Sequence, residues 1–175
     1  IITLQTEHPA ILDSCEALER EGCSITYLPV DNKGLVAAHS VESAIRNDTV
    51  LVSIMTANNE TGVIQPIAEI GEICRNRGVL FHTDAVQAIG KIPFKVDAMR
   101  VDLASLTAHK FYGPKGVGAL YVRNAKPKAE LRKIIDGGGQ ERGMRAGTLN
   151  VAGIVGFGAA AELILLELED EMKKI

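Results

Sequence analysis

The sequence is poor in aromatic residues and cysteines. It has no tryptophan, and aromatic residues make up 4% of its 175 residues. Its three cysteines, Cys15, Cys23 and Cys74, are odd in number and far apart in the chain. This spacing argues against a disulfide framework and against a CxxC zinc site, so we expect small core-filling thiols and no metal.

Long apolar runs and an excess of one charge are also absent. No run approaches the about 20 apolar residues of a membrane span. The start of the chain, IITLQTEHPA, lacks the basic residues and the cleavage pattern of a signal peptide. The net charge is -3, with basic residues scattered among acidic ones. We therefore expect a cytoplasmic protein that binds neither membranes nor nucleic acid.

The rest of the composition is that of an ordinary globular protein. With 46% hydrophobic and 23% charged residues, the chain can form one core, and we expect a single domain over residues 1–175. β-branched runs alternate with stretches of helical periodicity, which is typical of an α/β fold with central parallel strands. Strands are predicted at residues 1–5, 24–28, 50–55, 79–82, 103–106 and 118–122. Helices are predicted at residues 10–21, 41–46, 67–77 and 151–174, and residues 123–133 are predicted to lie on the surface.

Polar side chains follow four of the predicted strands. Each has a structural explanation when taken singly, such as a helix cap, a turn or a solvated lysine. In a parallel sheet, however, the carboxyl ends of the strands lie at one edge, where ligands bind. The joint placement therefore predicts a binding site there. The residues are Glu7 and His8, Asn58 and Asn59, Asp84 and Gln87, and Thr107, His109 and Lys110.

Lys110 gives this site a chemical interpretation. A lysine held in a cleft at a strand end is desolvated and becomes a nucleophile towards carbonyl compounds. The cofactor that uses such a lysine is pyridoxal phosphate (PLP), whose ring nitrogen needs an acidic partner and whose phosphate needs hydroxyl and amide donors. Asp84 is a candidate for the first role, and Thr107 and His109 are candidates for the second. Gln87, expected one helical turn after Asp84, is a candidate donor to the phenolic oxygen of the ring.

Five motifs then match a known family in order along the chain: TEHPA, ANNETG, HTDAVQ, AHKFYGPKG and GGGQERGMRAGT. With them the whole chain resembles the class V, fold-type I PLP enzymes of the cysteine desulfurase group, the NifS and IscS type. The resemblance implies a three-layer, doubly wound, mostly parallel sheet of the PLP-transferase large-domain type. It also implies removal of sulfur from L-cysteine to give alanine and an enzyme persulfide, for iron–sulfur cluster or thio-cofactor assembly.

The resemblance implies a role for each site residue. Lys110 would bind PLP covalently, His8 would stack on the ring as acid and base, and Asp84 would pair with the ring nitrogen. Gln87 would contact the phenolic oxygen, and Asn59 would lie near the cofactor and the substrate carboxylate. Two residues, Thr107 and His109, would bind the phosphate, where the family usually has serine in place of the threonine. Thr148 would reach the phosphate of a neighbouring subunit, which implies a homodimer with shared sites.

Parts of the family pattern are missing from the sequence. The glycine-rich phosphate loop that precedes this region, the small C-terminal domain with the persulfide-forming cysteine, and the substrate-binding arginine are not found. We expect that none of the three cysteines replaces that nucleophile. The chain is thus interpreted as a central fragment of the large domain, truncated at both ends, that forms an oligomer. Sulfur-acceptor or scaffold proteins are expected partners of the full-length family.

Two alternatives remain. The first is a selenocysteine lyase or another class V aminotransferase or lyase, since these enzymes use the same lysine and aspartate. The second alternative is a non-catalytic oligomerising fragment that binds no cofactor. A nucleotide-binding function is disfavoured, because the chain has neither GxGxxG after the first predicted strand nor GxxxxGK[ST].

Overall fold

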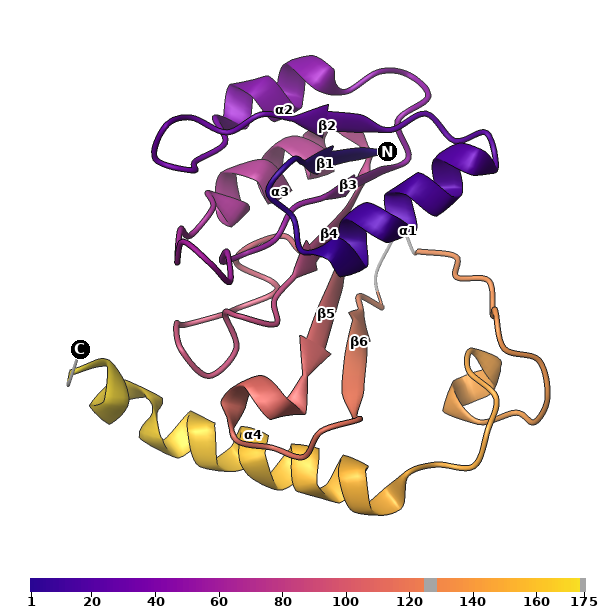
Figure 1. Cartoon of the computed structure of the whole chain (residues 1–175), viewed down its shortest axis with the longest axis vertical. Helices are drawn as coiled ribbons and strands as arrows, with labels where there is room; N and C mark the ends of the chain where they lie inside the picture. The colour runs from indigo at the N-terminus through magenta and orange to yellow at the C-terminus, as the bar shows by residue number, and fades with distance from the viewer. Residues whose placement is uncertain (125–128, 174–175) are drawn as a thin grey trace.

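The computed structural model describes residues 1–124 and 129–173. In this part of the chain, six strands form a sheet in the order β2-β1-β3-β4-β5-β6 (Figure 1). Neighbouring strands are parallel except for β6, which runs antiparallel to β5. This arrangement confirms the predicted mostly parallel sheet. The strands are β1 (Ile2–Leu4), β2 (Thr26–Leu28), β3 (Leu51–Ser53), β4 (Leu80–Asp84), β5 (Leu103–Thr107) and β6 (Gly118–Val122).

Helices cover both faces of the sheet. α2 and α3 pack on one face, and α1 lies on the other, where Tyr27 of β2 donates a hydrogen bond to Glu19 of α1 (3.0 Å) (Figure 1). α3 follows Pro66 and ends at Gly78, whose φ of 70° favours glycine. The helices are α1 (Pro9–Arg20), α2 (Ala38–Ala44), α3 (Ile67–Arg77), α4 (Val151–Met172), and the 3-10 turns η1 (Ala108–Phe111) and η2 (Glu141–Gly143).

The two faces of the sheet differ in chemistry because strand residues alternate in direction. Towards α2 and α3 the strands present apolar side chains, among them Leu4, Val52 and Phe81, and these form the main core. The opposite face presents a row of polar side chains on neighbouring strands. These are Thr3, Ser53, His82, Asp84, Ser105 and Thr107.

Most predicted elements are confirmed, with two differences besides shifted strand ends. α2 begins at Ala38 and ends at Ala44, so the predicted helix over 41–46 is displaced. The residues after Asp84 form turns and not a helix, so the prediction that Gln87 lies one helical turn after Asp84 is wrong. The predicted end of the last helix at residue 174 and part of the predicted surface segment 123–133 lie outside the described residues.

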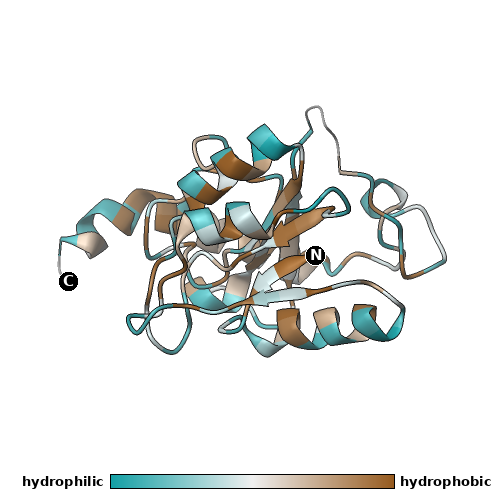
Figure 2. Ribbon diagram, turned by 90° about the horizontal axis from the view of Figure 1, so that it is seen from above, coloured by the Kyte–Doolittle hydropathy of each residue, from teal (hydrophilic) through white to brown (hydrophobic). Residues whose placement is uncertain are grey.

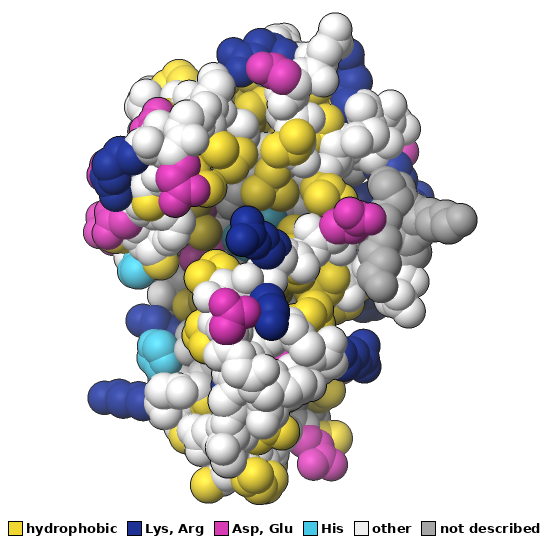
Figure 3. All heavy atoms as spheres, turned by 90° about the vertical axis from the view of Figure 1, so that its right-hand side faces the viewer, with side chains coloured by type: hydrophobic (Ala, Val, Ile, Leu, Met, Phe, Trp, Pro, Cys, Tyr) yellow, Lys and Arg dark blue, Asp and Glu magenta, His cyan; other side chains and the backbone are white. Residues whose placement is uncertain are grey.

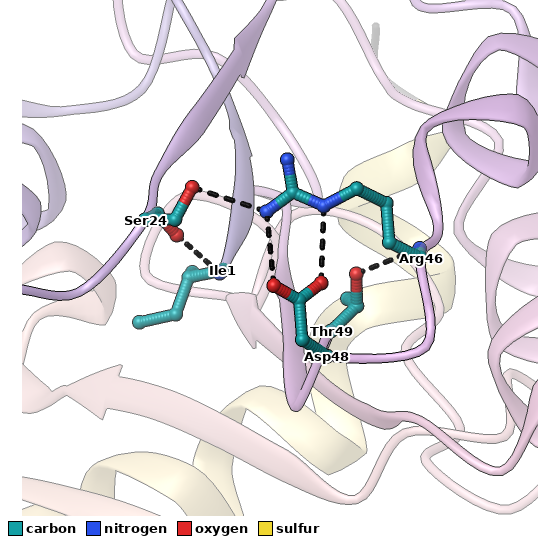
Figure 4. A network of polar contacts seen from close by, with 5 residues as sticks. All are labelled: Ile1, Ser24, Arg46, Asp48 and Thr49. Atoms are coloured by element: carbon teal, nitrogen blue, oxygen red, sulfur yellow. Dashed lines mark hydrogen bonds and ion pairs between the residues drawn. The ribbon is translucent and has the colours of Figure 1, made fainter.

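The network in Figure 4 ties the amino-terminal edge of the sheet together. The Arg46 guanidinium donates to Asp48 Oδ1 (3.0 Å) and to Ser24 Oγ (3.0 Å), and its backbone N–H donates to Thr49 Oγ1 (2.9 Å). The amine of Ile1 donates to the carbonyl of Ser24 (2.8 Å). These contacts lie at the opposite end of the strands from the predicted site. Over the face drawn in Figure 3, charged side chains are scattered among exposed apolar ones.

α4 is apolar and largely uncovered. It contacts the body of the molecule through Phe157, whose ring centroid lies 5.4 Å from that of Phe111 in η1, and its C-terminal end extends beyond the other elements (Figure 2). The stretch Val151–Asp170 is long and apolar enough to cross a membrane, with a mean hydropathy of 1.9, and 6% of it is buried. The expectation that no run approaches that length is therefore wrong, because Glu162 and Glu167 are the only charged residues between positions 151 and 168. Length and composition alone do not make it a membrane span, since helices in the core of a soluble protein can be equally long and apolar.

Candidate functional site

Four neighbouring parallel strands direct their carboxyl ends to one edge of the sheet. His8 follows β1 and Asn59 follows β3, while Asp84 ends β4 and Lys110 follows β5. The prediction that these strand ends share an edge is confirmed by the strand order. The edge therefore brings together residues that are up to about a hundred positions apart in the chain.

His8 is held as the cap of α1. Its Nδ1 accepts a hydrogen bond from the backbone N–H of Ala10 (3.1 Å), which satisfies one of the free donors at the start of the helix. An Nδ1 that accepts must carry a lone pair, so in the neutral ring the proton is on Nε2. The exposed imidazole can therefore present an N–H donor at Nε2 to a ligand.

Glu7, next to His8, is buried and was not assigned a role from the sequence. Its side chain is 5% exposed, and its Oε1 accepts the backbone N–H of Met55 (2.8 Å), just beyond β3. Its Oε2 has no hydrogen-bond partner within the described part of the chain. Burial raises the pKa of Glu7 to about 8, with the Met55 N–H opposing this shift and the charge of Asp84 adding to it.

Asn58 organises the loop that follows β3. Its side-chain nitrogen donates to the carbonyl of Thr6 (2.9 Å), which joins this loop to the end of β1. Its Oδ1 accepts the backbone N–H groups of Glu60 (3.0 Å) and Thr61 (2.9 Å), forming an Asx turn. Asn58 is thus a structural residue of the site, which agrees with the interpretation of this segment as a turn. Its neighbour Asn59, the predicted ligand contact, is exposed.

Replacing Asn58 with alanine is expected to lower the free energy of unfolding by roughly 1–3 kcal/mol, because two loop N–H groups and the Thr6 carbonyl lose their partner. Asn59→Ala is the matched control, and we expect a change within about 0.5 kcal/mol because its side chain is exposed. Urea denaturation of both variants measures the difference. Equal losses in the two variants would contradict this role of Asn58.

Asp84 lies at the centre of this edge. It is 9% exposed, and its Oδ1 accepts the backbone N–H of Val86 (2.9 Å). Its backbone is fixed on both sides, since its carbonyl accepts from the N–H of Thr56 (2.9 Å) and the next residue donates to Ser105 (3.0 Å). Among the described residues, no Lys or Arg pairs with this carboxylate.

His82, two residues before Asp84 on the same face, connects three strands. Its Nδ1 lies 2.8 Å from Ser53 Oγ in β3, and its Nε2 lies 2.9 Å from Ser105 Oγ in β5. Burial lowers the pKa of His82, and the charge of Asp84 opposes that shift only in part. A neutral imidazole with both nitrogens bound therefore fixes the strands around Asp84. The sequence interpretation missed this residue, although its place in the HTDAVQ motif was visible.

Lys110 is exposed, so the expectation that it is desolvated in a cleft is wrong. The reason is the geometry of η1, where residues three apart lie on the same side of the turn. Ala108 and Phe111 are buried, so His109 and Lys110 between them point outwards. Gly113 then lets the chain return closely over η1, because a Cβ at this position would lie 2.8 Å from the Cβ of Ala108.

Thr107 and His109 contact each other. Thr107 Oγ1 lies 2.9 Å from His109 Nδ1 and also 3.4 Å from the carbonyl of Val117. The contact fixes the exposed imidazole at the end of β5, next to Lys110. The structure therefore brings together the two residues that the sequence assigned to an anion.

Two other predicted site residues are not brought into this group. The side chain of Gln87 accepts a hydrogen bond from Lys91. Thr148 is exposed, on the segment that extends away from the β6 edge of the sheet before α4 begins (Figure 1). Their assigned roles stay predictions.

His8, Asn59, His109 and Lys110 are exposed at this edge of the sheet. The described hollows lie elsewhere: one of about 340 Å³ is lined by Arg75, Arg100 and Arg123, and one of about 240 Å³ is lined by Gln65, Ile92 and Met99. Within residues 1–124 and 129–173, no group of three or more His, Cys, Asp or Glu side chains is placed to hold a metal ion.

The fold and this edge define an α/β domain with a ligand site at the carboxyl ends of parallel strands. The family model "Aminotransferase class-V" matches residues 1–175. The "Cysteine desulfurase IscS" of Anaeromyxobacter dehalogenans (strain 2CP-C) is 60% identical over 175 residues, covering 100% of this chain and 43% of that protein.

Two solved structures are similar. A "NIFS-LIKE PROTEIN" matches with a TM-score of 0.91 and 48% identity, covering 97% of this chain and 46% of the other. "SspA in complex with cysteine" matches with a TM-score of 0.88 and 48% identity, covering 92% and 46%. The chain therefore belongs to the aminotransferase class-V family, and it spans less than half the length of these relatives.

Proposed function

We propose that this chain forms the PLP-binding floor of a cysteine desulfurase, which removes sulfur from L-cysteine to give alanine and an enzyme persulfide. The observation that carries the proposal is the buried Asp84 carboxylate at the end of β4, on the strand next to β5, which ends at Thr107 and is followed by His109 and Lys110. The similarity of the whole chain to cysteine desulfurases supports the choice of reaction. The similar structure named as a complex with cysteine supports the substrate.

The residues fit the cofactor on chemical grounds. A buried carboxylate is costly unless a cation or several donors balance it, and the Asp84 carboxylate accepts one backbone N–H. A protonated ring nitrogen would supply that missing positive charge. When bound, PLP supplies a ring that takes up the electrons released from the α carbon of an amino acid.

The end of β5 would hold the rest of the cofactor. The single proton of the Thr107 hydroxyl can go to His109 Nδ1 (2.9 Å) or to the Val117 carbonyl (3.4 Å). Donation over the shorter contact leaves the neutral imidazole with its proton on Nε2, which can donate to a phosphate. The exposed amine of Lys110, the next residue, is free to form the covalent link. His8 would donate a proton to the substrate from Nε2, because its Nδ1 already accepts a hydrogen bond from the backbone N–H of Ala10.

The cysteines do not offer a persulfide-forming nucleophile. Burial raises the pKa of Cys15 and raises that of Cys74 to about 12, so their reactive thiolates are scarce at neutral pH. Cys23 is exposed, but it lies before β2, at the edge of the sheet opposite Lys110. We infer that sulfur transfer needs a cysteine outside these residues.

The remaining assignments rest on family resemblance. Contacts of Asn59 with substrate, of Gln87 with the ring oxygen and of Thr148 with a neighbouring subunit are part of the proposal. So are the homodimer, sulfur-acceptor or scaffold proteins, a cytoplasmic location, and the choice of cysteine over selenocysteine.

The test is covalent uptake of PLP by the purified chain. We expect a new absorbance band on mixing, which reduction with borohydride makes permanent, and peptide mapping should place the label on Lys110 and not on the nearby exposed Lys115. A label spread over several lysines would contradict the proposal. An unchanged spectrum would instead favour a non-catalytic oligomerising module, the candidate supported by exposed apolar residues of α4 such as Leu165 and Leu166.

A further inference from the structure

Glu7 is a buried carboxyl group in which only one of the two oxygens has a hydrogen-bond donor. One oxygen accepts the N–H of Met55 (2.8 Å), and the other has no partner among the described residues although solvent does not reach it. With 5% of the residue exposed, an ionised carboxylate here would lose most of its hydration. A single backbone donor does not offset that loss, whereas a protonated acid has no charge to solvate.

The charges around Glu7 also favour the protonated acid. The negative charge of Asp84, at the end of β4, makes ionisation of Glu7 less favourable. Cys15 of α1 also interacts with Glu7, but it is a neutral thiol at neutral pH and offers no positive charge. Within the part of the chain that the structure describes, no Lys or Arg forms an ion pair with it. When two carboxyl groups share a site, the proton stays on the one whose surroundings stabilise its charge less.

The position of Glu7 links it to His8. The turn between β1 and α1 carries both residues, and the Met55 contact joins that turn to the end of β3 across 48 positions of sequence. His8 itself is oriented by its own bond to Ala10 at the start of α1. A displacement of the Glu7 side chain would therefore move the turn that carries His8.

We propose that Glu7 is a positioning residue held as a neutral carboxylic acid, which joins the His8 turn to the end of β3 and leaves Asp84 as the buried negative charge of the cofactor floor. The statement about Asp84 rests on the proposed function, whereas the proton on Glu7 and its hold on His8 do not. From the sequence alone, Glu7 was predicted only to be a polar residue at a strand end.

Infrared spectroscopy of the 175-residue chain without cofactor tests the proton. Glu7→Gln keeps an oxygen acceptor for Met55 and is neutral at every pH, and Glu16→Gln on the exposed side of α1 is the matched control. We expect an acid C=O band at pH 7 that disappears as the pH rises past about 8. The band should be absent from Glu7→Gln and present in Glu16→Gln. No acid band in the parent at pH 7, or a band that persists in Glu7→Gln, would overturn the proposal.

Nitrogen chemical shifts of the His8 ring test the positioning. They report which ring nitrogen is protonated, a quantity that a general loss of stability does not change. We expect Glu7→Gln to keep the parent shifts and Glu7→Ala, which lacks the Met55 contact, to change them. Unchanged shifts in Glu7→Ala, or equal changes in both folded variants, would overturn this role. Neither measurement involves PLP, so a failure of cofactor binding is distinguishable from a failure of this inference.

Discussion

Lys110→Ala is expected to abolish the covalent uptake of PLP, with no borohydride-stable label left on the chain. The reason is placement: Lys110 lies in the turn η1 that follows β5, and β5 is the neighbour of β4, the strand that ends at Asp84. Lys115→Ala is the control, because Lys115 is also exposed but lies beyond the Gly113 turn. It should keep the label and the absorbance band.

Among the described lysines, Lys91 is the other candidate for covalent reaction with PLP, so a Lys91→Ala variant is also needed. Burial lowers the pKa of Lys91, and the charge of Lys110 lowers it further, so more of its amine is neutral and reactive at a given pH. Removing Lys110 takes away that second contribution, which should make Lys91 less reactive and not more. A label that survives in Lys110→Ala but disappears in Lys91→Ala would therefore show that the covalent site has been assigned to the wrong lysine.

The sheet was predictable because its signal is local and repetitive. Apolar β-branched runs bounded by turn residues predicted all six strands, and the strand-end argument followed from parallel topology. α2 was displaced because its apolar pattern is short and its first residue, Ala38, lies among weakly patterned neighbours. Gln87 was misplaced because a single spacing was taken as helical where the chain instead forms consecutive turns.

Burial in the site was harder to predict than position. The motif identified Lys110 but not its exposure, which depends on Ala108 and Phe111 occupying the inner side of η1. Glu7 and His82 were missed as functional groups for a related reason. Their environments come from Met55, Ser53 and Ser105 on other strands, and no local pattern in the sequence contains those pairings.

The second large effect expected is a loss of stability with rising pH that is caused by Glu7. The pKa of Glu7 is about 8 in the folded chain and has its ordinary value of 4.5 in the unfolded chain, so the unfolded chain releases the proton first as the pH rises. The contribution of Glu7 to the free energy of unfolding is fully present below the unfolded pKa of 4.5, and it is lost as the pH rises towards the folded pKa of about 8. We expect the free energy of unfolding to fall by about 3 kcal/mol between pH 5 and pH 8.

His82 has the opposite dependence, which gives the measurement an internal check. Its folded pKa is lowered from 6.5 by burial, so the unfolded chain binds the proton more readily and stability is lost as the pH falls below that value. Denaturation at several pH values should therefore show Glu7→Gln gaining stability over the parent at pH 8 while keeping the loss at low pH. A parent whose stability does not fall between pH 7 and pH 8, or a Glu7→Gln variant that falls in parallel with it, would contradict a protonated Glu7.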